Sequence, residues 1–176
     1  MKKQRKERPY ALLGDAPVLE AGRNDHLEVE NPATVLSSAA IETANPLTIA
    51  FADLDYFGQV NKEFGWPTGD EVLKEVCDTI RQHMRKTDWI GRYGSEEFCL
   101  VMPGTAMEVA AKVLKRIREA IEFHDFQSVD GEPVPMTISI GAAAAVPGDS
   151  DYLELLARAS SQALKAKQNG RNQLII

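Results

Sequence analysis

Two short apolar runs that flank a glycine turn constrain the fold of this chain most strongly. Residues 88–101 read Asp-Trp-Ile-Gly-Arg-Tyr-Gly-Ser-Glu-Glu-Phe-Cys-Leu-Val. A connection through Gly94-Ser95 suits a β-hairpin, because glycine accepts the positive φ that tight hairpin turns need. The flanking runs are typical of buried strands. The segment therefore predicts a hairpin whose second strand starts with two carboxylates, Glu96 and Glu97. Neighbouring strand residues point to opposite faces, so one carboxylate can face a pocket while the other faces the opposite side or the rim.

A second acidic pair lies upstream. The apolar run 47–52 ends in Asp53-Leu54-Asp55, so carboxylates are expected at the ends of two strands. Such an arrangement suits a hard cation, and Mg²⁺ is usually held by one or two carboxylates together with substrate phosphates. The two acidic pairs therefore indicate phosphoryl or nucleotidyl transfer.

The composition limits the classes of protein to consider. A chain of 176 residues, 44% hydrophobic and 26% charged, fits one globular domain with a tail. The net charge of −6 argues against a nucleic-acid polymer as partner. We found no run of about 18 to 20 apolar residues that would span a membrane and no secretory signal, so the cytoplasm is the expected location. Cys77 and Cys99 are expected to be buried free thiols.

The hydrophobic periodicity predicts alternating strands and helices in the second part of the chain. We expect residues 1–45 to form an N-terminal leader, with a basic end and a short helix over 35–43, and residues 46–176 to form the domain. The order of the expected elements predicts an α+β fold with a central mixed sheet covered by helices. Helices are expected over 57–64, 70–84, 106–123 and from 149 or 150 to 168, and strands over 47–52, 135–145 and 173–176 besides the hairpin.

Several sequence blocks follow one another in a distinctive order between residues 47 and 176. They are Asp53-Leu-Asp-Tyr-Phe57, Val60-Asn61, Phe64-Gly65, Gly69-Asp70, Arg92-Tyr-Gly-Ser-Glu-Glu-Phe98, Thr137-Ile-Ser-Ile-Gly141 and Ala166-Lys-Gln-Asn-Gly-Arg-Asn172. Their joint order and spacing resembles the GGDEF family, the bacterial diguanylate cyclases. The resemblance implies a palm-like fold related to nucleotidyl cyclases. It also implies condensation of two GTP molecules into cyclic di-GMP, a second messenger, with release of pyrophosphate by a homodimer.

The same resemblance implies roles for the acidic residues. Asp53, Glu97 and the Leu54 carbonyl would hold two Mg²⁺ ions, or Mn²⁺ as an alternative, on the GTP triphosphate. Glu96 would be a further catalytic carboxylate. Against this, Asp55 and Glu96 can be exposed charges at strand ends, and for Asp55 we favour that interpretation.

Further residues match the positions of the family that bind substrate. Asn61 and Asp70 would recognise guanine, and their carboxamide and carboxylate groups suit its hydrogen-bonding edge. Lys167 and Arg171 would bind the triphosphate, which the backbone at Gly94 and Ser95 would approach closely. An alternative for Asp70 is a favourable charge in the first turn of a helix, and for the two cations it is stabilisation of a helix C-terminus.

Arg85 and Asp88 match an inhibitory site of the family, at which the product cyclic di-GMP binds away from the active site. Arg116, in the next expected helix, would supply a second contact from another domain. As isolated residues, all three would be ordinary surface charges.

The chain departs from the family pattern at several positions. Ser95 replaces the second glycine of the signature, Gly58 a usual lysine and Trp66 a usual histidine. If position 95 needs a positive φ, serine there costs on the order of 1 kcal/mol or more. The segment 25–34 keeps little of the usual start of the domain. These departures leave a second hypothesis open, in which the chain is a catalytically silent module that binds cyclic di-GMP or GTP.

Overall fold

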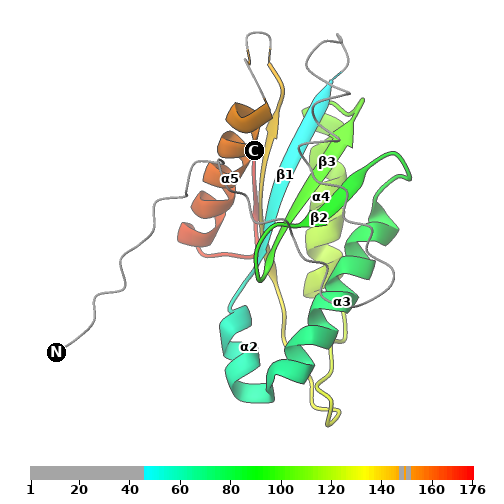
Figure 1. Cartoon of the computed structure of the whole chain (residues 1–176), viewed down its shortest axis with the longest axis vertical. Helices are drawn as coiled ribbons and strands as arrows, with labels where there is room; N and C mark the ends of the chain where they lie inside the picture. The colour runs from blue at the N-terminus through cyan, green and yellow to red at the C-terminus, as the bar shows by residue number, and fades with distance from the viewer. Residues whose placement is uncertain (1–45, 147–148, 150–151) are drawn as a thin grey trace, which may run out of the picture.

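The computed structural model describes residues 46–146, 149 and 152–176, and its centre is a five-stranded mixed sheet. The strand order is β2-β3-β1-β4-β5; all neighbours are antiparallel except β4 and β5 (Figure 1). The predicted leader and the helix over 35–43 lie outside the described residues. The strands are β1 (Leu47–Leu54), β2 (Trp89–Arg92), β3 (Glu97–Pro103), β4 (Ile138–Ala144) and β5 (Leu174–Ile175).

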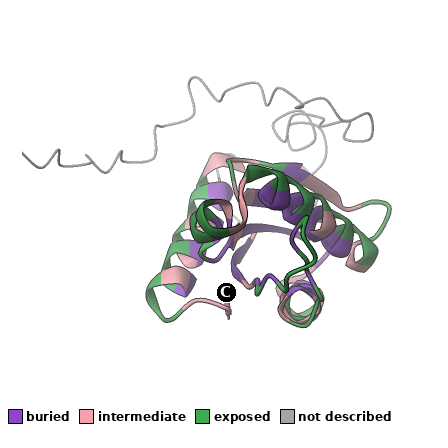
Figure 2. Cartoon of the chain, turned by 90° about the horizontal axis from the view of Figure 1, so that it is seen from below, coloured by how far each residue is buried: buried purple, intermediate pink, exposed green. Residues whose placement is uncertain are grey.

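Helices cover both faces of the sheet, so the predicted α+β architecture is confirmed. In the described part, α3 and α4 pack with α2 on one face, and α5 covers the other face. Figure 2 shows buried strand segments between helices whose outward sides are exposed. None of the helices in this described part is long and apolar enough to cross a membrane. The helices are α2 (Phe57–Phe64), α3 (Trp66–His83), α4 (Met107–Glu122) and α5 (Tyr152–Gln168).

The central strand β1 divides its side chains between two cores. Ala50 and Ala52 belong to the core under α2, α3 and α4, whereas Ile49 and Phe51 belong to the core under α5. Because side chains alternate along a strand, Asp53 continues the second series and faces the side of the sheet that α5 covers. The hydrophobic alternation of β1 therefore decides where the first expected metal ligand points.

The helix predicted from Asp70 starts earlier, at Trp66. Gly65, with φ 84°, is the only residue between α2 and α3. Pro67 lies in the first turn of α3, where the missing N–H would have had no helical partner. The helix therefore begins before the proline and not after it.

Close contact between α5 and β4 depends on a residue without a side chain. A Cβ built on Gly141 would collide with backbone atoms of α5 at Ala159, Gln162 and Ala163. Backbone cannot rotate away as a flexible side chain can. Gly141 therefore sets the distance between this helix and the sheet, and with it the position of residues at the end of α5.

We predict that Gly141→Ala destabilises the domain by about 1 to 3 kcal/mol, since overpacking forces backbone apart. Denaturant unfolding followed by circular dichroism measures the loss. Gly58→Ala is the matched control, because a Cβ there meets nothing within 4 Å and alanine favours a helix. An unchanged unfolding midpoint for Gly141→Ala would show that α5 moves away from the sheet at no cost.

Candidate active site

The tip of the hairpin differs from the predicted two-residue turn. Four residues, 93–96, connect β2 to β3, and neither Gly94 nor Ser95 has a positive φ. The Arg92 guanidinium donates hydrogen bonds to the carbonyl oxygens of Gly94, at 3.1 Å, and Ser95, at 2.5 Å. Position 95 thus needs no positive φ, and the cost that serine would have there under that condition does not arise.

Gly94 leaves space for the observed position of a neighbouring side chain. A Cβ at this position would collide with the carboxylate of Glu97. The backbone amides of Tyr93 and Gly94 both donate to the Glu97 carbonyl, at 2.7 and 3.3 Å. The turn thus folds back over the first residue of β3, and glycine leaves room for its side chain.

The register of the sheet brings two of the predicted carboxylates together. Asp53 in β1 lies directly opposite Glu97 in β3, and directly opposed residues of antiparallel strands point to the same face with Cβ atoms about 4.5 to 5.5 Å apart. Glu96, one residue earlier, instead lines a pocket with residues of α2 and α3. This confirms that the two glutamates face different surroundings.

Lys167, at the end of α5, reaches the same point. Its Nζ lies 2.6 Å from Asp53 Oδ1 and donates to the Leu54 carbonyl oxygen at 2.7 Å. The carboxylate and the carbonyl that are expected to bind metal therefore converge on one position, and that position already suits a cation. The donor set fits Mg²⁺, which prefers oxygen ligands.

Burial and crowding perturb both carboxylates. Burial raises the pKa of Asp53, Lys167 opposes this by hydrogen bonding and charge, and Glu96 and Asp55 add to it. Burial also raises the pKa of Glu97, as do the charges of Asp53 and Glu96, while Lys167 lowers it. A divalent cation at this position would lower both pKa values further and so stabilise the charged carboxylates.

The described residues contain no group of three or more histidine, cysteine, aspartate or glutamate side chains arranged to hold a metal ion. The ligand set expected from the sequence is smaller than such a group, with two carboxylates and one carbonyl. Mg²⁺ commonly takes its remaining ligands from water and phosphate, so this small set suits an ion that arrives with a nucleotide.

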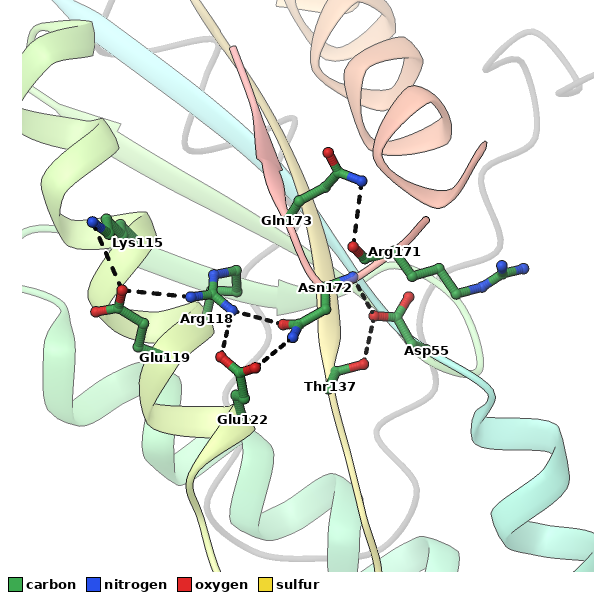
Figure 3. A network of polar contacts seen from close by, with 9 residues as sticks. All are labelled: Asp55, Lys115, Arg118, Glu119, Glu122, Thr137, Arg171, Asn172 and Gln173. Atoms are coloured by element: carbon green, nitrogen blue, oxygen red, sulfur yellow. Dashed lines mark hydrogen bonds and ion pairs between the residues drawn. The ribbon is translucent and has the colours of Figure 1, made fainter. Parts of the chain in front are cut away.

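Asp55 is not the exposed charge that we expected. Its side chain is fully buried and accepts hydrogen bonds from Ser139 Oγ at 2.7 Å, Thr137 Oγ1 at 2.8 Å and the backbone amide of Asn172 at 3.0 Å. Figure 3 shows two of these contacts. The motif blocks at 137–141 and 166–172 contain these partners, but the spacing of the sequence did not reveal that they converge on Asp55.

Asn172 extends this network to α4. Its side chain accepts from Arg118 at 2.8 Å and donates to Glu122 at 2.7 Å, and Arg118 also contacts Glu122 at 2.6 Å (Figure 3). The hydrogen bonds from Arg118 and Asn172 lower the pKa of Glu122. The turn after α5 is thus held from both sides, which fixes the end of the helix that carries Lys167.

A pocket of about 300 Å³ lies on the other side of the hairpin tip. Asn61 and Asp70 both line it, together with Ser95 and Glu96. Gly69 makes this possible, since a Cβ there would collide with the Asn61 carboxamide. The buried Asn61 Oδ1 has no hydrogen-bond partner among the described residues. The other residues that line the pocket were not assigned to a site from the sequence; they are Phe57, Gly58, Lys62, Trp66, Leu73 and Arg92.

Arg171 does not join Lys167 at the carboxylates. Its guanidinium stacks 4.5 Å from the centre of the Tyr56 ring. Both residues have a positive φ, 65° and 58°, which is uncommon without glycine. The stack links the loop after β1 to the turn after α5.

The predicted product site forms a turn between α3 and β2. The Arg85 amide donates to Asp88 Oδ2 at 2.8 Å, and the Asp88 amide donates to the Arg85 carbonyl at 3.0 Å. Asp88 Oδ1 is buried and has no hydrogen-bond partner in the described part. Arg116 is exposed on α4, and among the described residues no ion pair joins it to this turn.

We predict that Glu97→Gln stabilises the metal-free protein at about pH 8. A carboxyl whose pKa is raised by folding, here above 4.5, destabilises the fold above that folded pKa and not below the unfolded value. The gain should therefore shrink as the pH falls towards about 4. Chemical unfolding in the presence of EDTA measures it, with Glu63→Gln, at an exposed carboxylate of α2, as control. A gain that is independent of pH would contradict the electrostatic cause.

Comparisons with known proteins agree with this geometry. Residues 28–173 match the family described as "Diguanylate cyclase, GGDEF domain". The diguanylate cyclase DosC of Escherichia coli K12 is 33% identical over 77% of this chain, and the response regulator PleD of Caulobacter vibrioides is 38% identical over 74%. These alignments cover 29% of either relative, so the chain spans less than a third of their length.

Solved structures show the same fold. The active GGEEF domain of a diguanylate cyclase from Vibrio cholerae superimposes with a TM-score of 0.70 at 31% identity, covering 75% of this chain and 83% of that one. The GGDEF domain of DgcB from Caulobacter crescentus, solved in complex with c-di-GMP, gives 0.71 at 29% identity, covering 74% and 77%. The sequence match, the sheet and the signature hairpin together show that this chain belongs to the GGDEF family of diguanylate cyclase domains.

Proposed function

We propose that this domain is a diguanylate cyclase that condenses two GTP molecules into cyclic di-GMP and releases two pyrophosphates. The observation that carries the proposal is the convergence of the Asp53 carboxylate and the Leu54 carbonyl on one cation position, with Glu97 opposite Asp53. A pocket with unused hydrogen-bonding capacity lies beside it, at the same hairpin tip.

The pocket supports the choice of guanine. The unpaired Asn61 Oδ1 can accept a hydrogen bond from an N–H of the base, and the Asp70 carboxylate can accept from the N1–H and the exocyclic amine. An adenine edge presents a different set of donors. The residues at this pocket would therefore select and orient the base before reaction.

The carboxylates support the choice of reaction. Mg²⁺ held by Asp53, Glu97 and the Leu54 carbonyl would neutralise charge on the triphosphate as a 3′-hydroxyl attacks the α-phosphorus. Glu96, which lines the pocket, would accept the proton of that hydroxyl. Lys167 and Arg171 would bind phosphate oxygens, since both extend from the end of α5 towards the loop after β1.

The size of the pocket supports a homodimer. A volume of about 300 Å³ lies at the lower end for ligand sites and suits one base. Two domains would therefore have to face each other, each with one GTP, to join two nucleotides. We propose the cytoplasm, where GTP is available, as the location of the domain.

The competing hypothesis is a silent module that binds nucleotide without turnover. Ser95 was its main support within the described residues, and the backbone there carries no left-handed strain. The carboxylates, the pocket and the cation at the end of α5 are all present. These observations favour the enzyme.

We further propose that cyclic di-GMP inhibits the enzyme by binding at Arg85 and Asp88. The buried, unpaired Asp88 Oδ1 can accept from a guanine N–H, and the exposed Arg85 guanidinium can contact phosphate or guanine. Arg116 of a second domain, or of another surface of the same one, would complete the contact.

We predict that the protein incubated with GTP and Mg²⁺ forms cyclic di-GMP and pyrophosphate, identified by mass spectrometry. Glu97→Gln should abolish turnover, because it removes the charge of a metal ligand and keeps its shape. Asn61→Ala should leave the metal site intact and raise the KM for GTP by about tenfold, since a good pair of hydrogen bonds to a base contributes about 1 to 3 kcal/mol. GTP binding without product would support the silent module instead.

Product inhibition has its own test. Arg85→Ala should accumulate more cyclic di-GMP and bind it more weakly by calorimetry, because alanine lacks both the charge and the planar fork of arginine. Lys86→Ala, a neighbouring exposed cation, is the control. Undiminished binding in Arg85→Ala, or inhibition that vanishes at saturating GTP, would show that the product acts elsewhere.

A further inference from the structure

The ammonium group of Lys167, which is expected to bind phosphate, contacts three oxygen atoms of the protein itself. Its Nζ donates to the Leu54 carbonyl at 2.7 Å and lies 2.6 Å from Asp53 Oδ1 and 3.6 Å from Asp55 Oδ1. Its side chain is only 18% exposed. The ammonium group thus contacts oxygen atoms of the last two residues of β1 and of the residue that follows the strand.

Two of these oxygens are the atoms expected to bind Mg²⁺. A magnesium ion lies about 2.0 to 2.1 Å from its oxygen ligands, so on the Asp53 and Leu54 oxygens it would lie close to the ammonium nitrogen that already contacts both at 2.6 to 2.7 Å. Two cations confined to so small a space would also repel each other strongly. The lysine in its observed position and a metal ion on these oxygens therefore destabilise one another.

We propose that Lys167 is a resident counter-cation of the metal site, which keeps free divalent metal out and moves to phosphate when metal arrives with GTP. This inference rests on the proposed function of the site and adds an order of events to it. Free metal offers the displaced lysine no new partner. A metal–nucleotide complex offers phosphate oxygens nearby, so the exchange then loses little.

The surroundings of Lys167 suit such an exchange. Lys167 lies in the last turn of α5, and the backbone after it is fixed through Asn172 to Asp55 and α4. The helix end can therefore stay in place while the four methylene groups of the lysine change rotamer. Asp55 keeps three hydrogen bonds without the lysine, so its charge remains compensated when Lys167 leaves.

The test is the affinity for Mn²⁺ in the absence of nucleotide, measured on the whole chain by the paramagnetic resonance of free Mn²⁺. Lys167→Met should bind Mn²⁺ on the order of tenfold more tightly than the parent, because a positive charge next to the ligands is removed. Lys167→Gln provides a second variant if the methionine variant fails to fold, which circular dichroism would reveal. Lys165→Met, at an exposed lysine two residues earlier that contacts Gln162, is the matched control and should bind as the parent does.

A non-hydrolysable GTP analogue supplies the second measurement. Adding it should raise the Mn²⁺ affinity of the parent by a larger factor than that of Lys167→Met, because only the parent gains a lysine–phosphate contact. Equal Mn²⁺ affinity of parent and Lys167→Met without nucleotide, or equal enhancement by the analogue, would overturn the proposal.

Glu97→Gln separates failure of this inference from failure of the proposed function. If Glu97→Gln weakens Mn²⁺ binding while Lys167→Met leaves it unchanged, the metal site stands and the counter-cation is rejected. If Glu97→Gln has no effect even in the Lys167→Met background, the carboxylates hold no metal, and the proposed function fails together with the inference.

Discussion

The hydrogen bonds around Asp55 hold together the part of the fold on which the site depends. This buried carboxylate accepts hydrogen bonds from the hydroxyl of Ser139, near the start of β4, and from the hydroxyl of Thr137, just before β4. It also accepts one from the backbone amide of Asn172, in the turn after α5. Buried charges are tolerated when hydrogen bonds satisfy them, and removing one partner leaves a costly orphan. The end of β1, the start of β4 and the end of α5 are thereby fixed to one another.

Strand alternation then distributes the chemistry. Asp53 and Glu97 share a face because they are register partners, and α5 covers that face because Gly141 lets it approach. Glu96 falls on the opposite side with Asn61 and Asp70. The hairpin tip therefore lies between the cation position and the pocket, and in the proposed reaction a nucleotide would extend around this tip, with its base in the pocket and its phosphates at the cation.

Much of this arrangement could be predicted from the sequence. Apolar periodicity located the strands and helices within a few residues, and the order of the motif blocks indicated which polar residues would meet. The prediction failed where a contact between distant segments decides the outcome. Asp55 looked exposed because its partners at Thr137, Ser139 and Asn172 come from other elements. The start of α3 was expected at Asp70, which is too late, because a proline is tolerated in the first turn of a helix and Pro67 occupies that place.

The role of Lys167 illustrates the same limit. Its position near a helix C-terminus is compatible with several functions, and only the folded chain shows its nitrogen against the Asp53 and Leu54 oxygens. The departures from the family at Gly58 and Trp66 proved to line the pocket. Their effect on nucleotide affinity depends on the ligand's pose, which sequence patterns do not contain.

Arg92 changes what the serine in the signature means. Its guanidinium holds two carbonyl oxygens of the hairpin tip, so this part of the tip's shape does not depend on a glycine at position 95. Position 95 is thereby free to carry a functional group. The Ser95 hydroxyl donates to Glu96 Oε2 at 3.1 Å, which restricts the rotamers of that carboxylate. The serine that replaces a glycine of the family signature can thus restrain the position of the neighbouring Glu96 carboxylate.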